Sequence, residues 1–314
     1  LLVFVCIATF TKKSKITKKS YSFLFLNVKF QIMEAIDRKI VGWTYPPAIE
    51  PSSRIPFREN WALSRIDHAF LVVAAYLAFV TFALVFLKPK NAKVQEKVVK
   101  DKKRKKSVGE KFNEAPLLFI LMVLYNVAQV ALCGYMVKEA FLGAKERDFE
   151  IACNEYNLNP RDRRLLNVLY VFYLSKVLDF ADTVFMVLKG SWRQVSFLHV
   201  YHHSSIFLVY WLILNAAYDG DVYFTIVLNG FIHFVMYGYY LATTLSISVP
   251  IVLKKMITNM QLIQFSCMLI QGAYLILKQC AYPRNMTWIY LFYITSMFVL
   301  FSNFKKKTYK KKTP

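Results

Sequence analysis

Three histidines lie close together in one apolar segment. The stretch FLHVYHHSSIF, residues 197–207, contains His199, His202 and His203, and the whole chain has only 5 histidines. On a helix, positions i, i+3 and i+4 lie on one face, so the three imidazoles can act together. Imidazole serves as a nucleophile, as a general acid or base, and as a metal ligand. The segment therefore predicts a chemical site inside an apolar helix.

Charged residues interrupt a second apolar segment, residues 166–188. Lys176, Asp179 and Asp182 follow at intervals of three residues, so they lie near one face of a helix. Inserting three charges into a bilayer costs roughly 8 to 10 kcal/mol, more than the apolar neighbours supply. We therefore expect these side chains to pair with one another or to face a polar cavity, and not to face lipid.

Two further apolar segments carry polar side chains at helical spacing. Asn229, His233 and Tyr237 succeed one another by one turn in the first, and Gln261 and Gln264 lie in the second. At about 1.5 Å of rise per residue, the polar side chains of all four segments lie roughly 7 to 12 Å below one membrane surface. We expect them to converge in one layer. The two glutamines alone would not identify a substrate site, because such side chains also bond neighbouring helices.

The composition is typical of a membrane protein. Hydrophobic residues make up 56% of the 314 positions and gather in long runs. At about 20 residues per span, we expect an all-α integral membrane protein with seven transmembrane helices. The expected spans are residues 68–88, 115–136, 166–188, 195–215, 222–241, 257–277 and 287–303.

The basic residues are concentrated in segments that we expect on one side of the membrane. The formal net charge of +22 is concentrated in short clusters, above all in residues 88–106 and 305–314. Such clusters fit anionic lipid or cytosolic topology signals, and no nucleic-acid-binding motif accompanies them, so we expect no nucleic-acid partner. Six expected spans separate the two clusters, which puts both in the cytosol and the N-terminal side in the lumen.

Two cysteines lie in loops expected on the lumenal side. Cys153 follows the second expected span and Cys280 follows the sixth. Because the lumen is an oxidising compartment, a disulfide between Cys153 and Cys280 is a reasonable hypothesis. Two free thiols are the alternative.

The chain divides into four parts. Residues 1–32, which start at Leu1, are expected to be an upstream extension or a non-native segment, with a signal peptide as the competing interpretation. Residues 33–67 are a lumenal N-terminal segment, residues 68–303 the seven-helix domain, and residues 304–314 a basic cytosolic tail.

The histidine spacing leaves several kinds of function open. Imidazoles spaced H-x-x-H-H can converge on a metal, as in membrane desaturases and hydroxylases, but 5 histidines are too few for a di-iron site of that kind. The number of histidines is still sufficient for a single zinc or iron bound by His199, His202, His203 and His233, or by an aspartate, so this interpretation remains open. A buried neutral imidazole can instead attack a thioester directly, with a second imidazole or a carboxylate to set its tautomer. A non-enzymatic seven-helix receptor or carrier is the third interpretation.

Four motifs, in order along the chain, resemble those of one family. They are KVLDFADT (176–183, like KxxExxDT but with Asp179 in place of Glu), HVYHH (199–203, like HxxHH), NGFIHFVMYGYY (229–240, like NxxxHxxMYxYY) and TNMQLIQF (258–265, like TxxQxxQF). From about residue 60 to the end, the chain resembles the ELO-type very-long-chain fatty acid elongases, the membrane 3-ketoacyl-CoA synthases. The run WRQVSFLHVYHH is most similar to the polyunsaturated fatty acid elongase subgroup.

The resemblance implies a fold and a reaction. Spans two to seven would form a barrel around an acyl tunnel, and a long-chain, polyunsaturated acyl-CoA would be condensed with malonyl-CoA as co-substrate, without a metal or a bound cofactor. The implied catalytic set is His202, His233, His199, His203, Asp182, Asp179 and Lys176. Within it, His202 would accept the acyl group and His233 would assist at the reacting carbonyl.

Substrate-binding roles are expected around that set. Asn229, His233 and Gln264 are candidate donors to the enolate formed when malonyl-CoA loses CO2. The full set of substrate-binding candidates is Asn229, Tyr237, Gln261, Gln264, Lys189, Arg193, Lys254 and Lys255. The four basic residues lie at the cytosolic rim, where they would contact CoA phosphates or serve equally as topology signals.

The resemblance also implies partners and a location. The 3-keto product would pass to a ketoacyl-CoA reductase, a dehydratase and an enoyl-CoA reductase, and the chain would contact membrane lipid. A homo-oligomer is left open. The terminal KKTP, with Lys311 and Lys312, resembles a dilysine retrieval signal. We therefore expect a multi-pass protein of the endoplasmic reticulum membrane with a cytosolic C-terminus.

Overall fold

A computed structural model describes residues 35–36, 39–40, 42–43, 61–90, 106–157 and 163–309. Two compact units can be distinguished along the chain, Leu1–Ile40 and Val41–Pro314. The described residues of the first unit are helical. All further statements concern the second unit, whose described residues contain helices, turns and loops and no β-strand.

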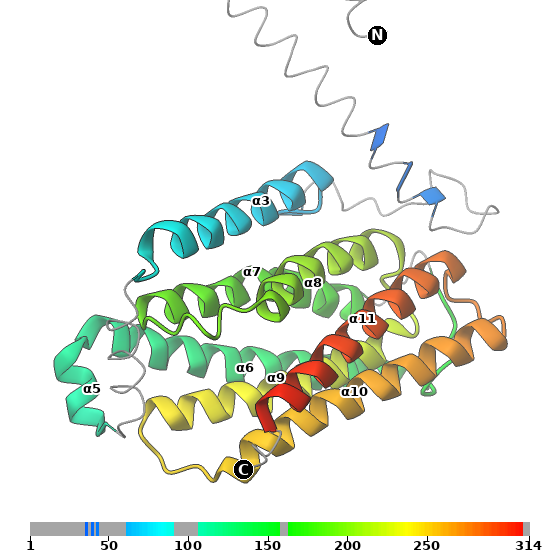
Figure 1. Cartoon of the computed structure of the whole chain (residues 1–314). Coiled ribbons are helices and arrows are strands. Elements are labelled where there is room, and N and C mark those ends of the chain that lie inside the picture. Colours follow the sequence, from blue (N-terminus) through cyan, green and yellow to red (C-terminus); the bar gives the residue numbers. More distant parts are fainter. Residues whose placement is uncertain are drawn as a thin grey trace, which may run out of the picture. The chain divides into compact units, whose positions relative to one another are not determined.

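Seven long helices build the described part of the second unit (Figure 1). They are α3 (Ile66–Phe82, continued by the π-helical turn η3, Ala83–Leu87), α6 (Pro116–Glu146), α7 (Arg164–Leu188), α8 (Phe197–Ala216), α9 (Val222–Thr244), α10 (Ile251–Leu277) and α11 (Arg284–Tyr309). The short helix α5 (Val108–Glu114) precedes α6. α6 contacts α7 and α9, α8 contacts α7 and α11, α10 contacts α9 and α11, and α3 lies against α7 and α8.

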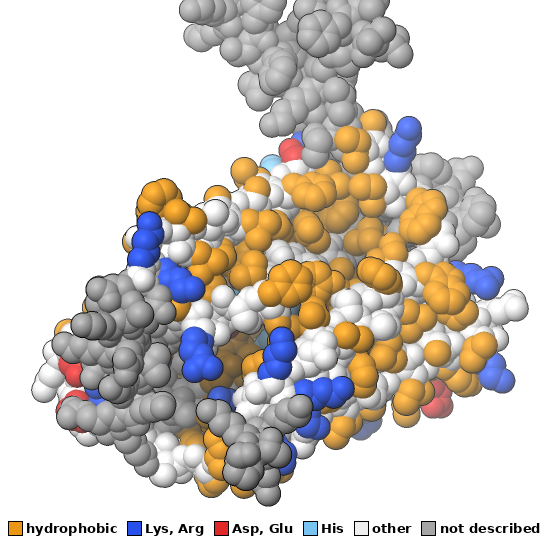
Figure 2. Space-filling view, viewed as in Figure 1, with side chains coloured by type: hydrophobic (Ala, Val, Ile, Leu, Met, Phe, Trp, Pro, Cys, Tyr) orange, Lys and Arg blue, Asp and Glu red, His pale blue; other side chains and the backbone are white. Residues whose placement is uncertain are grey.

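Six of the described helices are long and apolar enough to cross a membrane, namely α3 with η3, α6, α8, α9, α10 and α11. Figure 2 shows hydrophobic side chains across the middle of one face of these helices, with Lys and Arg side chains toward its ends. α7 is also long enough, at 25 residues, but Lys176, Asp179 and Asp182 interrupt its apolar sequence. The expected all-α fold with membrane-crossing helices is therefore confirmed, whereas a crossing by α7 stays a prediction.

Several helices extend beyond the apolar segments that predict them. α6 continues to Glu146 where the expected span ends at residue 136, and α10 begins at Ile251 where the expected span begins at residue 257. α11 continues to Tyr309, into the expected basic tail. An apolar run marks only the part of a helix that suits lipid, while Lys, Glu and Ala continue the backbone hydrogen bonding in water.

The short helix α5 lies at the end of the bundle that is expected in the cytosol, in contact with α6. Ser107 and Glu110 form a reciprocal capping box at its N-terminus. Lys111 then donates from Nζ to the carbonyl oxygens of Thr243 and Thr244, at 2.8 and 3.1 Å. Those carbonyls belong to the last turn of α9, where the Thr243 carbonyl also accepts from the backbone N–H of Ser246 at 3.2 Å, so the ammonium adds a charged donor to the C-terminal end of the helix.

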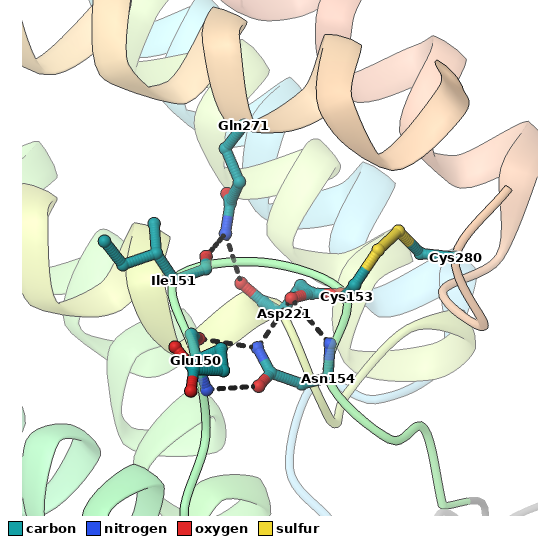
Figure 3. Close-up of a disulfide and its surroundings, with 7 residues drawn as sticks. All are labelled: Glu150, Ile151, Cys153, Asn154, Asp221, Gln271 and Cys280. Carbon is teal, nitrogen blue, oxygen red and sulfur yellow. Dashed lines mark hydrogen bonds between the residues drawn. A yellow bond between two sulfur atoms is a disulfide. The ribbon is translucent and has the colours of Figure 1, made fainter. Parts of the chain in front are cut away.

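A disulfide lies at the opposite end of the bundle (Figure 3). It joins Cys153, in the loop after α6, to Cys280, in the loop after α10, with the two Cα atoms 5.0 Å apart. In the same loop, the side chain of Asn154 donates to Oδ1 of Asp221 at 2.7 Å. Gln271 of α10 donates to a backbone carbonyl of the loop at 2.8 Å. These bonds tie the α6–α7 loop to α9, α10 and the α10–α11 loop.

The turn between α8 and α9 packs against the same loop. Gly220 has a φ of +65°, which L side chains rarely adopt, and a Cβ there would lie 3.1 Å from the carbonyl oxygen of Glu155. Beside it, the guanidinium of Arg147 forms a bidentate ion pair with the carboxylate of Asp219. Burial raises the pKa of the Asp221 carboxyl despite the hydrogen bonds that it accepts.

Candidate functional site

The histidine segment occupies the first two turns of α8. The hydroxyl of Ser196 caps this helix by accepting a hydrogen bond from the backbone N–H of His199 at 3.3 Å. The ring of His203 lies 4.2 Å from that of His199 and 5.2 Å from that of His202, measured between centroids. His233 of α9 lies nearly parallel to His202, at 6.4 Å. Four imidazoles from two helices thus form one cluster.

Two ring nitrogens of this cluster are buried without a partner. Within the described part of the chain, Nδ1 of His203, Nδ1 of His233 and Oδ1 of Asn229 have no hydrogen-bond partner. Buried polar atoms usually have a protein or water partner, so these three atoms are open to a water molecule or to a bound group. All three lie beside His202 or on the helix that faces it.

A cavity between α8, α9, α10 and α11 has a volume of about 20 Å³, room for about one water molecule. One imidazole and two amide side chains contribute to it, namely those of His202, Asn229 and Gln264. The rest of its lining is mainly apolar and aromatic, from Ile206, Val209, Tyr210, Thr225, Phe265, Met268, Tyr290, Tyr293 and Ile294. It is much narrower than the tunnel that the family resemblance implies.

The charged residues of α7 are paired inside the bundle. Lys176 and Asp179 are 3% and 2% exposed, and Nζ of Lys176 lies 3.1 Å from Oδ2 of Asp179. Gln129 of α6 donates to Oδ1 of Asp179 at 2.8 Å. The hydroxyl of Tyr237, on α9, lies 2.9 Å from Oδ2 of Asp182 and 3.3 Å from Oδ1 of Asp179. Neighbouring helices therefore supply the partners that offset the burial of these charges.

A hydrogen bond connects α7 to the histidine segment. Oγ1 of Thr183 lies 2.8 Å from Nε2 of His199 and 3.1 Å from the hydroxyl of Tyr76, on α3. Thr183 is fully buried and Tyr76 is nearly so. α3 therefore reaches the histidine cluster in two ways, through Thr183 to His199 and through the Tyr76 ring, which lies 6.3 Å from that of His203.

Most of the predicted site residues lie in these connected groups. The histidine cluster, the cavity and the α7 network together include His199, His202, His203, His233, Asn229, Gln264, Lys176, Asp179, Asp182 and Tyr237. Gln261 is half-buried and does not line the cavity. Lys189, Arg193, Lys254 and Lys255 are exposed. Lys311 and Lys312 lie outside the described residues.

The structure adds four side chains to which the motif reasoning gave no role. Gln129 and Tyr125 lie on α6 and are joined by a hydrogen bond of 3.0 Å, and the Tyr125 hydroxyl lies 3.4 Å from that of Tyr237. Their spacing of one turn inside an apolar segment was a usable signal. Thr183 ends one of the quoted motifs, whereas Tyr76 is one aromatic residue among many in its segment, and nothing in its local sequence marks it.

The donor arrangement does not favour a metal centre. Among the described residues, no three His, Cys, Asp or Glu side chains are grouped so as to hold a metal ion. Nε2 of His199 is engaged by Thr183, and Asp179 and Asp182 are engaged by Lys176 and Tyr237. The desaturase or hydroxylase interpretation is therefore not favoured.

Comparison with known proteins supports the motif-based resemblance. Residues 61–314 match the family model described as "ELO: GNS1/SUR4 family". The chain is 34% identical to very long chain fatty acid elongase 5 of Tachysurus fulvidraco, over 61% of this chain and 66% of that protein. It is 36% identical to very long chain fatty acid elongase 2 of Mus musculus over the same shares, and 33% identical to elongase 4 of Homo sapiens, over 62% of that protein. The chain thus spans just under two thirds of the length of these relatives. With the matched region covering the whole histidine cluster, the chain belongs to the ELO (GNS1/SUR4) family.

Proposed function

We propose that this chain condenses a long-chain, polyunsaturated acyl-CoA with malonyl-CoA to give a 3-ketoacyl-CoA, CO2 and CoA. The relatives are named very long chain fatty acid elongases, and lengthening an acyl chain requires a new carbon–carbon bond. The observation that carries the proposal is the position of His202. Its ring lines a mainly apolar cavity and lies beside His233, with the amides of Asn229 and Gln264 in the same lining.

In the first step, a neutral ring nitrogen of His202 attacks the thioester carbonyl of the acyl-CoA. The new C–N bond replaces the C–S bond, and the proton that the imidazole loses neutralises the departing CoA thiolate. No hydrogen bond within the described part of the chain occupies a ring nitrogen of His202, whereas Nε2 of His199 is bonded to Thr183. This difference favours His202 over His199 as the acyl acceptor.

In the second step, malonyl-CoA loses CO2 and its electron pair passes to an enolate. The enolate carbon attacks the acyl carbonyl on His202 and the C–N bond breaks, and the departing imidazolate is reprotonated by a solvent proton as the product leaves. The enolate needs hydrogen-bond donors in a site that excludes water. The side-chain amides of Asn229 and Gln264 and the buried ring of His233 supply that chemistry.

The charged residues of α7, Lys176, Asp179 and Asp182, pack beside this site together with their partner Tyr237. Lys176 and Asp179 neutralise each other, and Tyr237 bridges Asp179 and Asp182 while its own ring lies 5.9 Å from that of His233. We assign these residues to holding His233 and the histidine cluster in place. The shorter Asp179, where the family motif has Glu, still reaches Lys176.

The helix contacts support the implied barrel. In order, α6, α7, α8, α11, α10 and α9 each contact the next, and α9 contacts α6, while α3 lies outside this ring. We propose that all seven long helices span the endoplasmic reticulum membrane with the C-terminus in the cytosol. Because ligand sites usually exceed about 300 Å³, the four cavity-forming helices must separate to admit an acyl chain.

The rim expected in the cytosol suits CoA. Lys189, Arg193, Lys254 and Lys255 are exposed and can reach the phosphates of CoA. The 3-keto product must next be reduced, dehydrated and reduced again, so we propose a ketoacyl-CoA reductase, a dehydratase and an enoyl-CoA reductase as functional partners. No bound cofactor is required by these steps.

The test is a condensation assay with purified protein in detergent. Malonyl-CoA labelled in its retained carbons is supplied with a panel of saturated and polyunsaturated long-chain acyl-CoAs, and label in the 3-keto product is measured. His202→Ala is expected to lower the rate by a factor of about 10³ or more, because it removes the acyl acceptor. The matched control is His68→Ala, the same change at an exposed histidine of α3, and its rate should equal that of the wild type.

A second measurement tests the intermediate directly. With acyl-CoA alone, the wild type should release one equivalent of CoA and gain the acyl mass on the peptide that contains His202. His202→Ala should do neither. Condensation without any acyl-protein adduct would refute the covalent step, and no labelled product with any acyl-CoA from folded wild type would refute the proposed function.

A further inference from the structure

Tyr76, Thr183 and His199 form a continuous hydrogen-bonded chain across three helices. The phenol oxygen of Tyr76 lies 3.1 Å from Oγ1 of Thr183, which lies 2.8 Å from Nε2 of His199. Tyr76 is 5% exposed and Thr183 is 0% exposed, so water cannot replace either partner. The three residues come from α3, α7 and α8, and α3 lies outside the ring of helices around the cavity.

We propose that Tyr76 and Thr183 are positioning residues that hold His199 in one tautomer, with its proton on Nδ1 and with Nε2 as an acceptor. The inference rests on the proposed function for its catalytic consequence. α3 thereby contributes to the active site through Tyr76.

The direction of the chain follows from counting protons. If Tyr76 donates to Thr183, then the threonine proton is free to point at Nε2 of His199, and both hydroxyl protons, those of Tyr76 and Thr183, have acceptors within the three residues. In the reverse direction, Nε2–H would donate to Thr183 and Thr183 would donate to Tyr76. The buried phenol proton would then have no acceptor among the described residues, which is unfavourable. The forward direction is therefore the stable one.

Packing fixes the start of the chain in place. The ring of Tyr76 stacks on Phe180 with a centroid distance of 4.3 Å and an interplanar angle of 15°. Both side chains contact the apolar cluster formed by Val80, Ala83, Val187 and Val195. The hydroxyl therefore has little freedom to leave Thr183.

The consequence for the site is that the histidines have different roles, since His199 orients its neighbours and His202 accepts the acyl group. Nε2 of His199 is occupied, so this ring orients its neighbours and does not take the acyl group through that nitrogen. Its ring lies 4.2 Å from that of His203, which in turn lies 5.2 Å from that of His202. Rotation of His199 would displace His203 and, through it, the proposed acyl acceptor.

The first test uses Tyr76→Phe, which removes one hydroxyl and keeps the stacked ring. We expect kcat for condensation to fall roughly 10- to 100-fold with KM for the acyl-CoA unchanged, because orientation is lost and binding is not. Thr183→Val should reproduce the loss, and Thr183→Ser should restore most of the rate, because serine keeps the hydroxyl. The matched control is Tyr173→Phe, which deletes the hydroxyl of another buried tyrosine, bonded to the carbonyl oxygen of Leu63 at 2.8 Å, away from the histidines.

Equal kcat values for Tyr76→Phe and Tyr173→Phe would overturn the proposal. So would a Thr183→Ser variant as slow as Thr183→Val.

The second test does not depend on activity. The wild type, labelled with ¹⁵N in its 5 histidines, is studied by NMR in detergent, with His199 assigned by its loss in His199→Gln. We expect Nε2 of His199 to be unprotonated in the wild type and both tautomers to be populated in Tyr76→Phe. A protonated Nε2 in the wild type, or the same single tautomer in the variant, would overturn the proposal. If the wild type forms no 3-keto product, the proposed function fails while this spectrum still decides the tautomer.

Discussion

Removing the disulfide should destabilise the protein without abolishing its fold. Cys153 and Cys280 are 127 residues apart, so their bond closes a loop that contains α7, α8, α9 and α10. On the chain-entropy model, a loop of that length contributes about 5 kcal/mol to the free energy of unfolding. Helices that stay inserted in a micelle restrict the unfolded chain, so we expect the double variant Cys153→Ser with Cys280→Ser to lose about 2 to 5 kcal/mol.

The assay is unfolding in detergent by titration with sodium dodecyl sulfate, followed by the fluorescence of the 5 tryptophans. A reducing agent should lower the stability of the wild type to that of the double variant and should leave the double variant unchanged. The matched control is Cys267→Ser, because Cys267 is a free and half-buried thiol, and its midpoint should stay near that of the wild type.

Two results would refute this reasoning. A double variant as stable as the wild type would mean that the hydrogen bonds of Asn154 and Gln271 hold the loop without help. Equal effects of reductant on the wild type and on the double variant would mean that the loss comes from another site.

Two further predictions concern buried charge. Lys176→Met should destabilise the protein by about 3 to 5 kcal/mol in the same titration, because it leaves Asp179 buried with only uncharged partners such as Gln129. Adding Asp179→Leu to this variant should recover most of the lost stability. No recovery would contradict the ion-pair argument. Asp221→Asn should flatten the dependence of stability on pH. Because burial raises the pKa of Asp221 in the folded state, the wild type should lose stability as the pH rises above the ordinary carboxyl pKa. The Asn variant keeps the hydrogen bond from Asn154 and has no group that titrates there, so its stability should not fall over the same pH range. Parallel pH profiles of the two proteins would refute this.

Much of the site could be predicted from the sequence, because the relevant side chains repeat at helical spacing. His199, His202 and His203 had to share a face of one helix, and the charges of α7 had to turn away from lipid. Their meeting with His233 followed from the expected depth of each residue in the membrane. Helix ends were less predictable, because apolar runs measure the part of a helix that lipid covers.

The supporting residues could not be predicted in the same way. Tyr76 bonds Thr183 across 107 residues of sequence, and Gln129 bonds Asp179 across 50. Such pairs depend on which helices pack together, and nothing in the spacing within a single helix reports that. Gln261 shows the opposite error, since it matches a motif and a helical spacing yet does not line the cavity.

The network around α7 has a consequence for the order in which the protein is made. Tyr237, the partner of Asp182, is synthesised 55 residues later, about 3 to 11 s at ordinary elongation rates. During that interval α7 has α6 as an earlier neighbour, and Gln129 is already present to bond Asp179. If α7 crosses the membrane as predicted, its own hydropathy is too low to insert it alone, and pairing with α6 during synthesis would supply the first partner for its buried charges.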